Sequence, residues 1–140
     1  MSPGPKRSHF ILYVRDQRDS TRFYATVLGT EPDLQVDGMT EFALSDSTVL
    51  GLMPEAGIKR LLGETLPDPS RAHGVPRAEL YLVVEDPAAC HARALAAGAR
   101  ELSPLAPRDW GHRVAYSLDP DGHVLALAGR IDQGVISRCS

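Results

Sequence analysis

The chain has 140 residues, of which 43% are hydrophobic and 24% charged, and its formal net charge at pH 7 is −3. This composition is typical of one globular domain, and the lack of a basic run or stripe argues against nucleic acid as a partner. No apolar stretch approaches the ~18 residues of a membrane span and the first residues lack a secretory signal, so we expect a cytoplasmic protein without a membrane partner.

The first half of the sequence predicts a strand, a helix and three further strands. Arg7–Asp16 is rich in branched and aromatic residues, as strands are. Asp16, Asp19 or Ser20 can cap a helix that runs to Leu28, and Gly29 is a typical residue for its end. Three short strands are expected at Asp33–Asp37, Thr40–Leu44 and Thr48–Met53.

The middle of the chain is rich in Gly, Pro and charged residues. We interpret residues 55–76 as a linker, which could carry a short helical turn around Ile58–Leu62. A connection of this length without firm structure is often functional or mobile.

The second half predicts the same series of elements. Arg77–Asp86 is expected to form a strand, and Asp86 to cap an alanine-rich helix that starts with Pro87. Within this helix we expect Cys90 to be buried and His91 to lie on the outer face. Cys139 lies in the tail, so no structural disulfide is expected. Strands follow at Glu101–Leu105, Arg113–Leu118 and His123–Ala128, the last two joined by the turn Asp119–Gly122.

The two halves are an internal repeat. Arg7–Asp16 aligns without gaps on Arg77–Asp86, with apolar residues opposite apolar residues, and both segments end in Asp. The order β-α-β-β-β therefore occurs twice, which predicts an α+β fold. We expect one domain over residues 7–130, built from module one (7–54), the linker (55–76) and module two (77–128), followed by a C-terminal tail (131–140).

Several motifs within this repeat resemble the vicinal oxygen chelate superfamily, which contains glyoxalase I, bleomycin- and fosfomycin-resistance proteins and extradiol dioxygenases. The motifs are His9 seven positions before Asp16, the helix ending Arg22–Gly29, the turn Asp119–His123, and Trp110–Arg113 before a strand. The resemblance implies two βαβββ modules that form a curved, half-open mixed sheet around a cavity, in a protein that forms a homodimer.

The resemblance also implies where a divalent metal would bind, at four positions on the first and last strands of the modules. Here these positions hold His9, Gly51, Glu79 and Ala126. Gly51 and Ala126 have no donor side chain, and two ligands are fewer than the three that a catalytic zinc site normally keeps. We therefore expect no metal cofactor. A third ligand could still come from one of four other residues: Glu41, His73, His112 or His123.

Candidate ligand-binding residues remain without a metal: His9, Glu79, Trp110 and Arg113. His9 and Glu79 are expected to face one another across the cavity, where they would orient a ligand or supply a base, or would merely form a hydrogen-bonded pair. Trp110 is either a flat wall against a planar ligand or a plug at the mouth of the cavity. Arg113 could pair with an anionic group or be an ordinary surface residue.

Three tyrosines on predicted strands are further candidates to line the cavity, although core packing is the simpler expectation: Tyr13, Tyr81 and Tyr116.

The function favoured by these residues is metal-independent binding of a small organic molecule, as in the drug-sequestering members of the superfamily. The alternative is a lyase, isomerase or dioxygenase that uses His9, Glu79 and an unidentified third ligand around a divalent metal ion. A third possibility is a structural or regulatory dimer whose cavity is filled by its own side chains. The fold alone does not choose among these functions.

Overall fold

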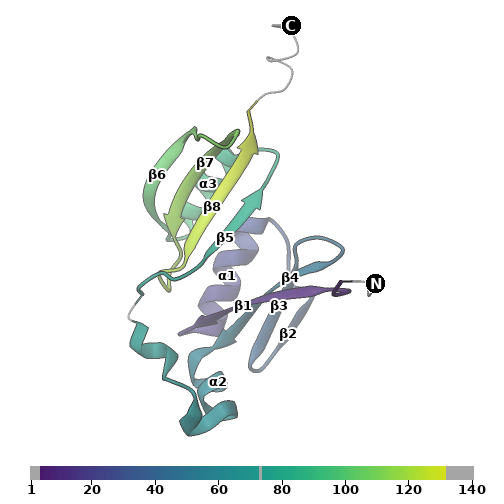
Figure 1. The fold of residues 1–140 in the computed structure, drawn as a ribbon, viewed down its shortest axis with the longest axis vertical. Coiled ribbons are helices and arrows are strands. Elements are labelled where there is room, and N and C mark those ends of the chain that lie inside the picture. The colour runs from purple at the N-terminus through teal and green to yellow at the C-terminus, as the bar shows by residue number, and fades with distance from the viewer. Residues whose placement is uncertain (1–3, 73, 132–140) are drawn as a thin grey trace, which may run out of the picture. The chain divides into compact units, whose positions relative to one another are not determined.

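A computed structural model describes residues 4–72 and 74–131 of the chain. His73, Cys139 and the predicted C-terminal tail, apart from Ile131, lie outside the described residues. The chain divides into two compact units, Met1–His73 and Gly74–Ser140, and each unit contains one α-helix-covered sheet (Figure 1).

The first unit contains one four-stranded mixed sheet in the order β1-β4-β3-β2, in which β1 runs parallel to β4 and the other neighbours are antiparallel. After this sheet the predicted linker region contains a helix and two short 3-10 turns. The elements are β1 (Ser8–Val14), α1 (Gln17–Leu28), β2 (Leu34–Val36), β3 (Met39–Ala43), β4 (Thr48–Pro54), α2 (Glu55–Leu62) and the turns Gly63–Thr65 and Pro69–Ala72.

The second unit repeats this arrangement with the strand order β5-β8-β7-β6, and again only the first and last strands run parallel. The identical order in both sheets confirms the α+β fold with two βαβββ units. The elements are β5 (Glu79–Val83), α3 (Pro87–Ala96), β6 (Arg100–Pro107), β7 (His112–Leu118) and β8 (Val124–Arg130).

In each unit, the Asp at the end of the aligned segment caps the helix that follows it. The Asp16 carboxylate accepts a hydrogen bond from the Asp19 N–H at 2.9 Å, and the Asp86 carboxylate accepts one from the Ala89 N–H at 3.0 Å. Each bond satisfies a backbone donor that the first turn of a helix leaves without a partner. Of the three candidate caps for α1, the structure uses Asp16.

In the first unit, α1 covers one face of the sheet. A hydrogen bond of 2.8 Å joins the hydroxyls of Thr21 on α1 and Thr40 on β3, and both residues are buried. Three large side chains of β3 and β4 are fully enclosed on this face: Phe42, Leu50 and Leu52. The residues that alternate with them on each strand are turned away from α1.

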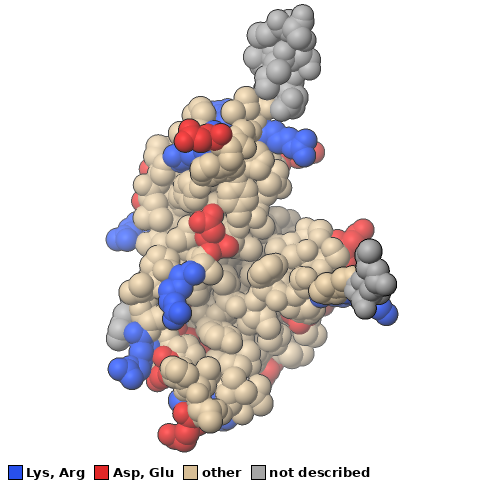
Figure 2. Space-filling view, in the orientation of Figure 1, with Lys and Arg blue, Asp and Glu red and all other residues tan. Residues whose placement is uncertain are grey.

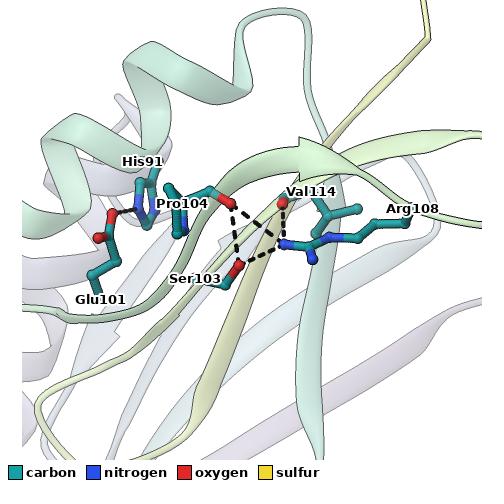
Figure 3. Close-up of polar contacts among 6 residues, drawn as sticks. All are labelled: His91, Glu101, Ser103, Pro104, Arg108 and Val114. Carbon is teal, nitrogen blue, oxygen red and sulfur yellow. Dashed lines mark hydrogen bonds and ion pairs between the residues drawn. The ribbon is translucent and has the colours of Figure 1, made fainter.

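In the second unit, α3 covers one face of the sheet and His91 is part of the contact. The expectation that His91 lies on the outer face of its helix is wrong, because His91 is only 7% exposed and its Nε2 lies 2.9 Å from Glu101 Oε2 on β6 (Figure 3). Cys90 is buried beside it, as predicted. Glu101 pairs with Ser117 in the sheet, so Ser117 and its alternate neighbours on β7 share the face of α3.

Charged side chains are dispersed over the surface in view. Figure 2 shows basic and acidic residues scattered singly or in small groups, without a large area of one sign. Among residues 4–72 and 74–131, none of the helices has the length and apolar character that crossing a membrane requires.

α3 packs so closely on β8 at Gly129 that a larger residue there should destabilise the protein. A Cβ added at Gly129 would lie 2.8 Å from Pro87 Cγ, in a rigid ring at the start of α3. We expect Gly129→Ala to lower the free energy of unfolding by about 1–3 kcal/mol, the usual cost of overpacking. The measurement is urea denaturation followed by circular dichroism.

The matched control for this prediction is Gly57→Ala. A Cβ there would meet only Pro54 Cβ at an ordinary 3.8 Å, and alanine is the better helix former in α2. Equal effects of the two substitutions would contradict the packing of Pro87 on Gly129.

Candidate functional site

The face of the second sheet opposite α3 carries two tyrosines over a floor of small residues. Because Ser117 faces α3, the alternate residues Val114 and Tyr116 of β7 face the other way, as do their partners on β8. Val114, Ala126 and Ala128 are fully buried there, and Tyr81 and Tyr116 pack against them. We call this surface the tyrosine face; its residues are Tyr81, His112, Val114, Tyr116, Ala126 and Ala128.

Ala126 lies at the centre of the tyrosine face. It pairs with Tyr81 of β5 on one side and with Tyr116 of β7 on the other. A methyl group at this position leaves room for both rings to pack against the sheet, and together they leave Ala126 with no exposed surface. The position at which the resemblance places a metal-binding carboxylate is therefore an apolar contact between two aromatic side chains.

A chain of hydrogen bonds runs along the edge of the tyrosine face. The Trp110 indole donates to the Tyr81 hydroxyl at 2.9 Å, and that hydroxyl lies 2.5 Å from His112 Nδ1. The indole N–H can only donate, so the Tyr81 oxygen accepts from it and its own proton is available to His112. When Nδ1 of His112 accepts this proton, its Nε2 carries the ring proton and can donate a hydrogen bond.

Arg108 covers the other tyrosine. Its guanidinium lies over the Tyr116 ring, 5.1 Å from the centroid, and its Nη2 donates to Ser103 Oγ at 2.7 Å and to the Val114 carbonyl at 2.8 Å (Figure 3). Burial raises the pKa of the Tyr116 hydroxyl, the charge of Glu79 raises it further, and Arg108 lowers it. The hydroxyl is therefore protonated at physiological pH and can donate a hydrogen bond.

The first unit holds a separate polar pair, His9 and Glu41. His9 Nδ1 lies 3.6 Å from Glu41 Oε2, although β4 runs between their strands. Two strand spacings are about 10 Å, so the two side chains reach toward one another across β4. Gly51 pairs with Glu41 on one side and with Ile11 on the other.

The residues at the four predicted metal positions do not fit a metal ion. A Cβ at Gly51 would lie 3.0 Å from Ile11 Cγ1 and 3.3 Å from Met39 Sδ, so these side chains occupy the space of a ligand there. Ala126 is covered by the tyrosines. Within residues 4–72 and 74–131, no three His, Cys, Asp or Glu side chains lie close enough together to hold a metal ion.

The predicted ligand-binding residues lie in three different environments. His9 belongs to the first unit and Glu79 to the second, at the start of β5, so the expectation that they face one another stays a prediction. Trp110 lies in the loop between β6 and β7, hydrogen-bonded to the tyrosine face and 58% exposed. Arg113 pairs with Gly129, whose missing Cβ points at Pro87, so Arg113 lies on the face of α3.

Sequence reasoning missed Arg108 and the Tyr81–His112 bond. From the sequence, His112 is only a possible metal ligand and Tyr81 only a possible lining residue. The one available signal was the spacing of Trp110 and His112, which places two polar aromatic side chains at the start of a strand. Nothing in the sequence distinguishes Arg108 from a surface arginine.

Comparison with known families gives one match over most of the chain. The sequence profile of the Glyoxalase/Bleomycin resistance protein/Dioxygenase superfamily matches residues 6–127. No functionally curated protein matches the chain.

Solved structures with the same fold cover most of both chains. A glyoxalase-related enzyme from Fulvimarina pelagi superposes with a TM-score of 0.73 at 23% identity, over 88% of this chain and 86% of that one. Protein ATC0852 from Agrobacterium tumefaciens gives 0.69 at 27%, over 89% and 96%. A family enzyme from Burkholderia phytofirmans gives 0.69 at 17%, over 88% and 97%. At these identities the likeness concerns the fold.

The hydrogen-bond chain predicts an optical response to Tyr81→Phe. The substitution removes the acceptor of the Trp110 indole, and Trp110 is the one tryptophan of the chain, so tryptophan fluorescence reports on this site. We expect a shifted emission maximum, lower anisotropy, and a loss of about 1 kcal/mol in the free energy of unfolding.

Tyr116→Phe is the matched control, since it removes a hydroxyl from the same face and leaves the Trp110–Tyr81 bond in place. An emission spectrum that is unchanged in Tyr81→Phe, or changed equally in the control, would contradict the hydrogen-bond chain.

Proposed function

This chain belongs to the Glyoxalase/Bleomycin resistance protein/Dioxygenase superfamily, and we propose that it is a binding module which holds a small aromatic molecule on its tyrosine face without a metal ion. The observation that carries this proposal is that Ala126, which has no donor, lies between two packed tyrosines at a position where the family resemblance implies a metal ligand. The surface offers stacking and hydrogen bonding in place of coordination.

The chemistry of the tyrosine face suits a planar organic ligand. Such sites combine aromatic and apolar contact area with a few polar groups that fix orientation. Here the rings of Tyr81 and Tyr116 supply the area, while the Tyr116 hydroxyl and His112 Nε2 are donors at its edge. The charge of Glu79 raises the pKa of the same hydroxyl, and this supports a part for the Glu79 carboxylate in the proposed site.

Trp110 is the contact that extends the site. A large aromatic side chain that is mostly exposed and yet held by a hydrogen bond is pre-organised to stack on a ligand, because little conformational freedom is lost on binding. This supports the interpretation of Trp110 as a flat wall. The ring also provides the signal with which binding can be followed.

The first test is a screen of aromatic antibiotics, catechols and aromatic thiol conjugates by thermal shift and by quenching of Trp110 fluorescence. A ligand at 100 times its Kd adds about 2.7 kcal/mol of stability, which is easily detected. We expect at least one compound to bind, and Trp110→Leu to weaken its binding at least tenfold in calorimetry.

Phe10→Leu serves as the control, since Phe10 is an exposed aromatic residue of the first unit. If no aromatic compound raises the melting temperature, or if Trp110→Leu binds as tightly as the natural chain, the proposal is wrong.

The second test concerns metal. Protein purified without chelator should contain far less than one equivalent of zinc, nickel, manganese or iron, and EDTA should not alter binding of the compound found in the screen. The reason is that Gly51 and Ala126 offer no donor. Stoichiometric metal that disappears in Glu79→Ala but not in the exposed control Glu85→Ala would favour a metal-dependent enzyme instead.

A further inference from the structure

Arg108 carries a positive charge for which the described part of the chain supplies no acidic partner. Its three hydrogen bonds go to neutral oxygens, those of Ser103, Pro104 and Val114. The ion pairs of residues 4–72 and 74–131 involve other side chains. Arg108 is half-buried, so its guanidinium has lost part of its hydration, and an anion replaces that hydration better than neutral acceptors do.

The hydrogen bonds of Arg108 leave part of the guanidinium unused. All three are made by Nη2, while Nε is buried and has no acceptor within the described residues. Nη1 also makes no hydrogen bond there, but unlike Nε it is not sealed from solvent. Of the two unused atoms only Nη1 can therefore be reached by a ligand atom, and its N–H groups are donors of a charged group.

The surroundings hold Arg108 in a fixed position. Its side chain crosses the irregular part of the β6–β7 pairing between Ser103 and Ala106 and spans to the Val114 carbonyl (Figure 3). The Tyr116 ring lies beneath the guanidinium plane. A stacked and tethered guanidinium has lost its side-chain freedom before any ligand binds, so an anion that meets Nη1 is held without further ordering cost.

A purely structural role explains only part of this arrangement. Two neutral acceptors can be bridged by a neutral amide, whereas a guanidinium adds a charge that the site does not neutralise. Glu79 is close enough to affect the Tyr116 hydroxyl, as Arg108 is, yet the two charges do not form an ion pair. The charge of Arg108 is thus available to a third group.

We propose that Arg108 is an anion-binding residue of the tyrosine face, which receives through Nη1 the carboxylate of an aromatic acid whose ring lies against Tyr116 and Trp110. This inference rests on the proposed function and narrows the ligand to aromatic compounds that carry an acidic group. The predicted anion contact at Arg113 lies on the other face of β7 and is separate from it.

The test compares 2-naphthoate with 2-naphthamide, which share the same ring system and differ in charge. Isothermal titration calorimetry should show at least tenfold tighter binding of naphthoate to the natural chain, and the preference should shrink as NaCl is added. Arg108→Gln should lose this preference and bind the two compounds about equally, because the charge that distinguishes them is gone. Arg108→Lys keeps a positive charge but lacks the planar guanidinium with its several N–H donors, so its affinity for naphthoate should fall several-fold.

Arg113→Gln is the matched control and should keep the full preference, because Arg113 is an exposed arginine on the face of α3. Thermal melts show whether each variant is folded; if Arg108→Gln is not, Arg108→Lys and the salt dependence of the natural chain decide. Equal affinities in the natural chain, or a preference that is undiminished in Arg108→Gln or Arg108→Lys, would overturn the anion site and leave the proposed function standing. Binding of neither compound would overturn both.

Discussion

The alternation of side chains across hydrogen-bonded strands decides which residues of this chain can act together. In the second unit α3 occupies one face of the sheet, fixed by the His91–Glu101 contact and by Pro87 against Gly129. The opposite face then receives every second residue of β7 and β8, and Tyr116 comes to lie beside Ala126. A register shift of one residue would turn Tyr116 toward α3, so the site depends on the pairing of the strands.

The two units share one topology and differ in the chemistry of their sheets. In the first, the polar group is a histidine–carboxylate pair, His9 and Glu41, that reaches across β4. In the second, the polar groups are a chain from Trp110 through Tyr81 to His112 and a tethered guanidinium. Duplication therefore conserves what builds a sheet and a capped helix, while the faces turned away from the helices have diverged. Function is to be sought on those faces.

The sequence predicts the fold well because its signals are local. Asp16 and Asp86 mark two helix starts, and alternating apolar residues mark the strands between them. The site is less predictable. The helix of His91 is rich in alanine, whose small side chains scarcely distinguish an inner from an outer face, and the contact to Glu101 arises only when β6 is in place. The hydrogen bonds of Arg108 depend on the irregular pairing of β6 with β7, and the residue pattern does not predict this irregularity.

Gly51 limits which side chains the first sheet can accept at this position. A Cβ there would lie 3.0 Å from Ile11 Cγ1 and 3.3 Å from Met39 Sδ. Any larger residue therefore requires both neighbouring side chains to shift. A donor group added at Gly51 would thus come together with a rearrangement of two residues on the adjacent strands, and engineering this face means redesigning three positions at once.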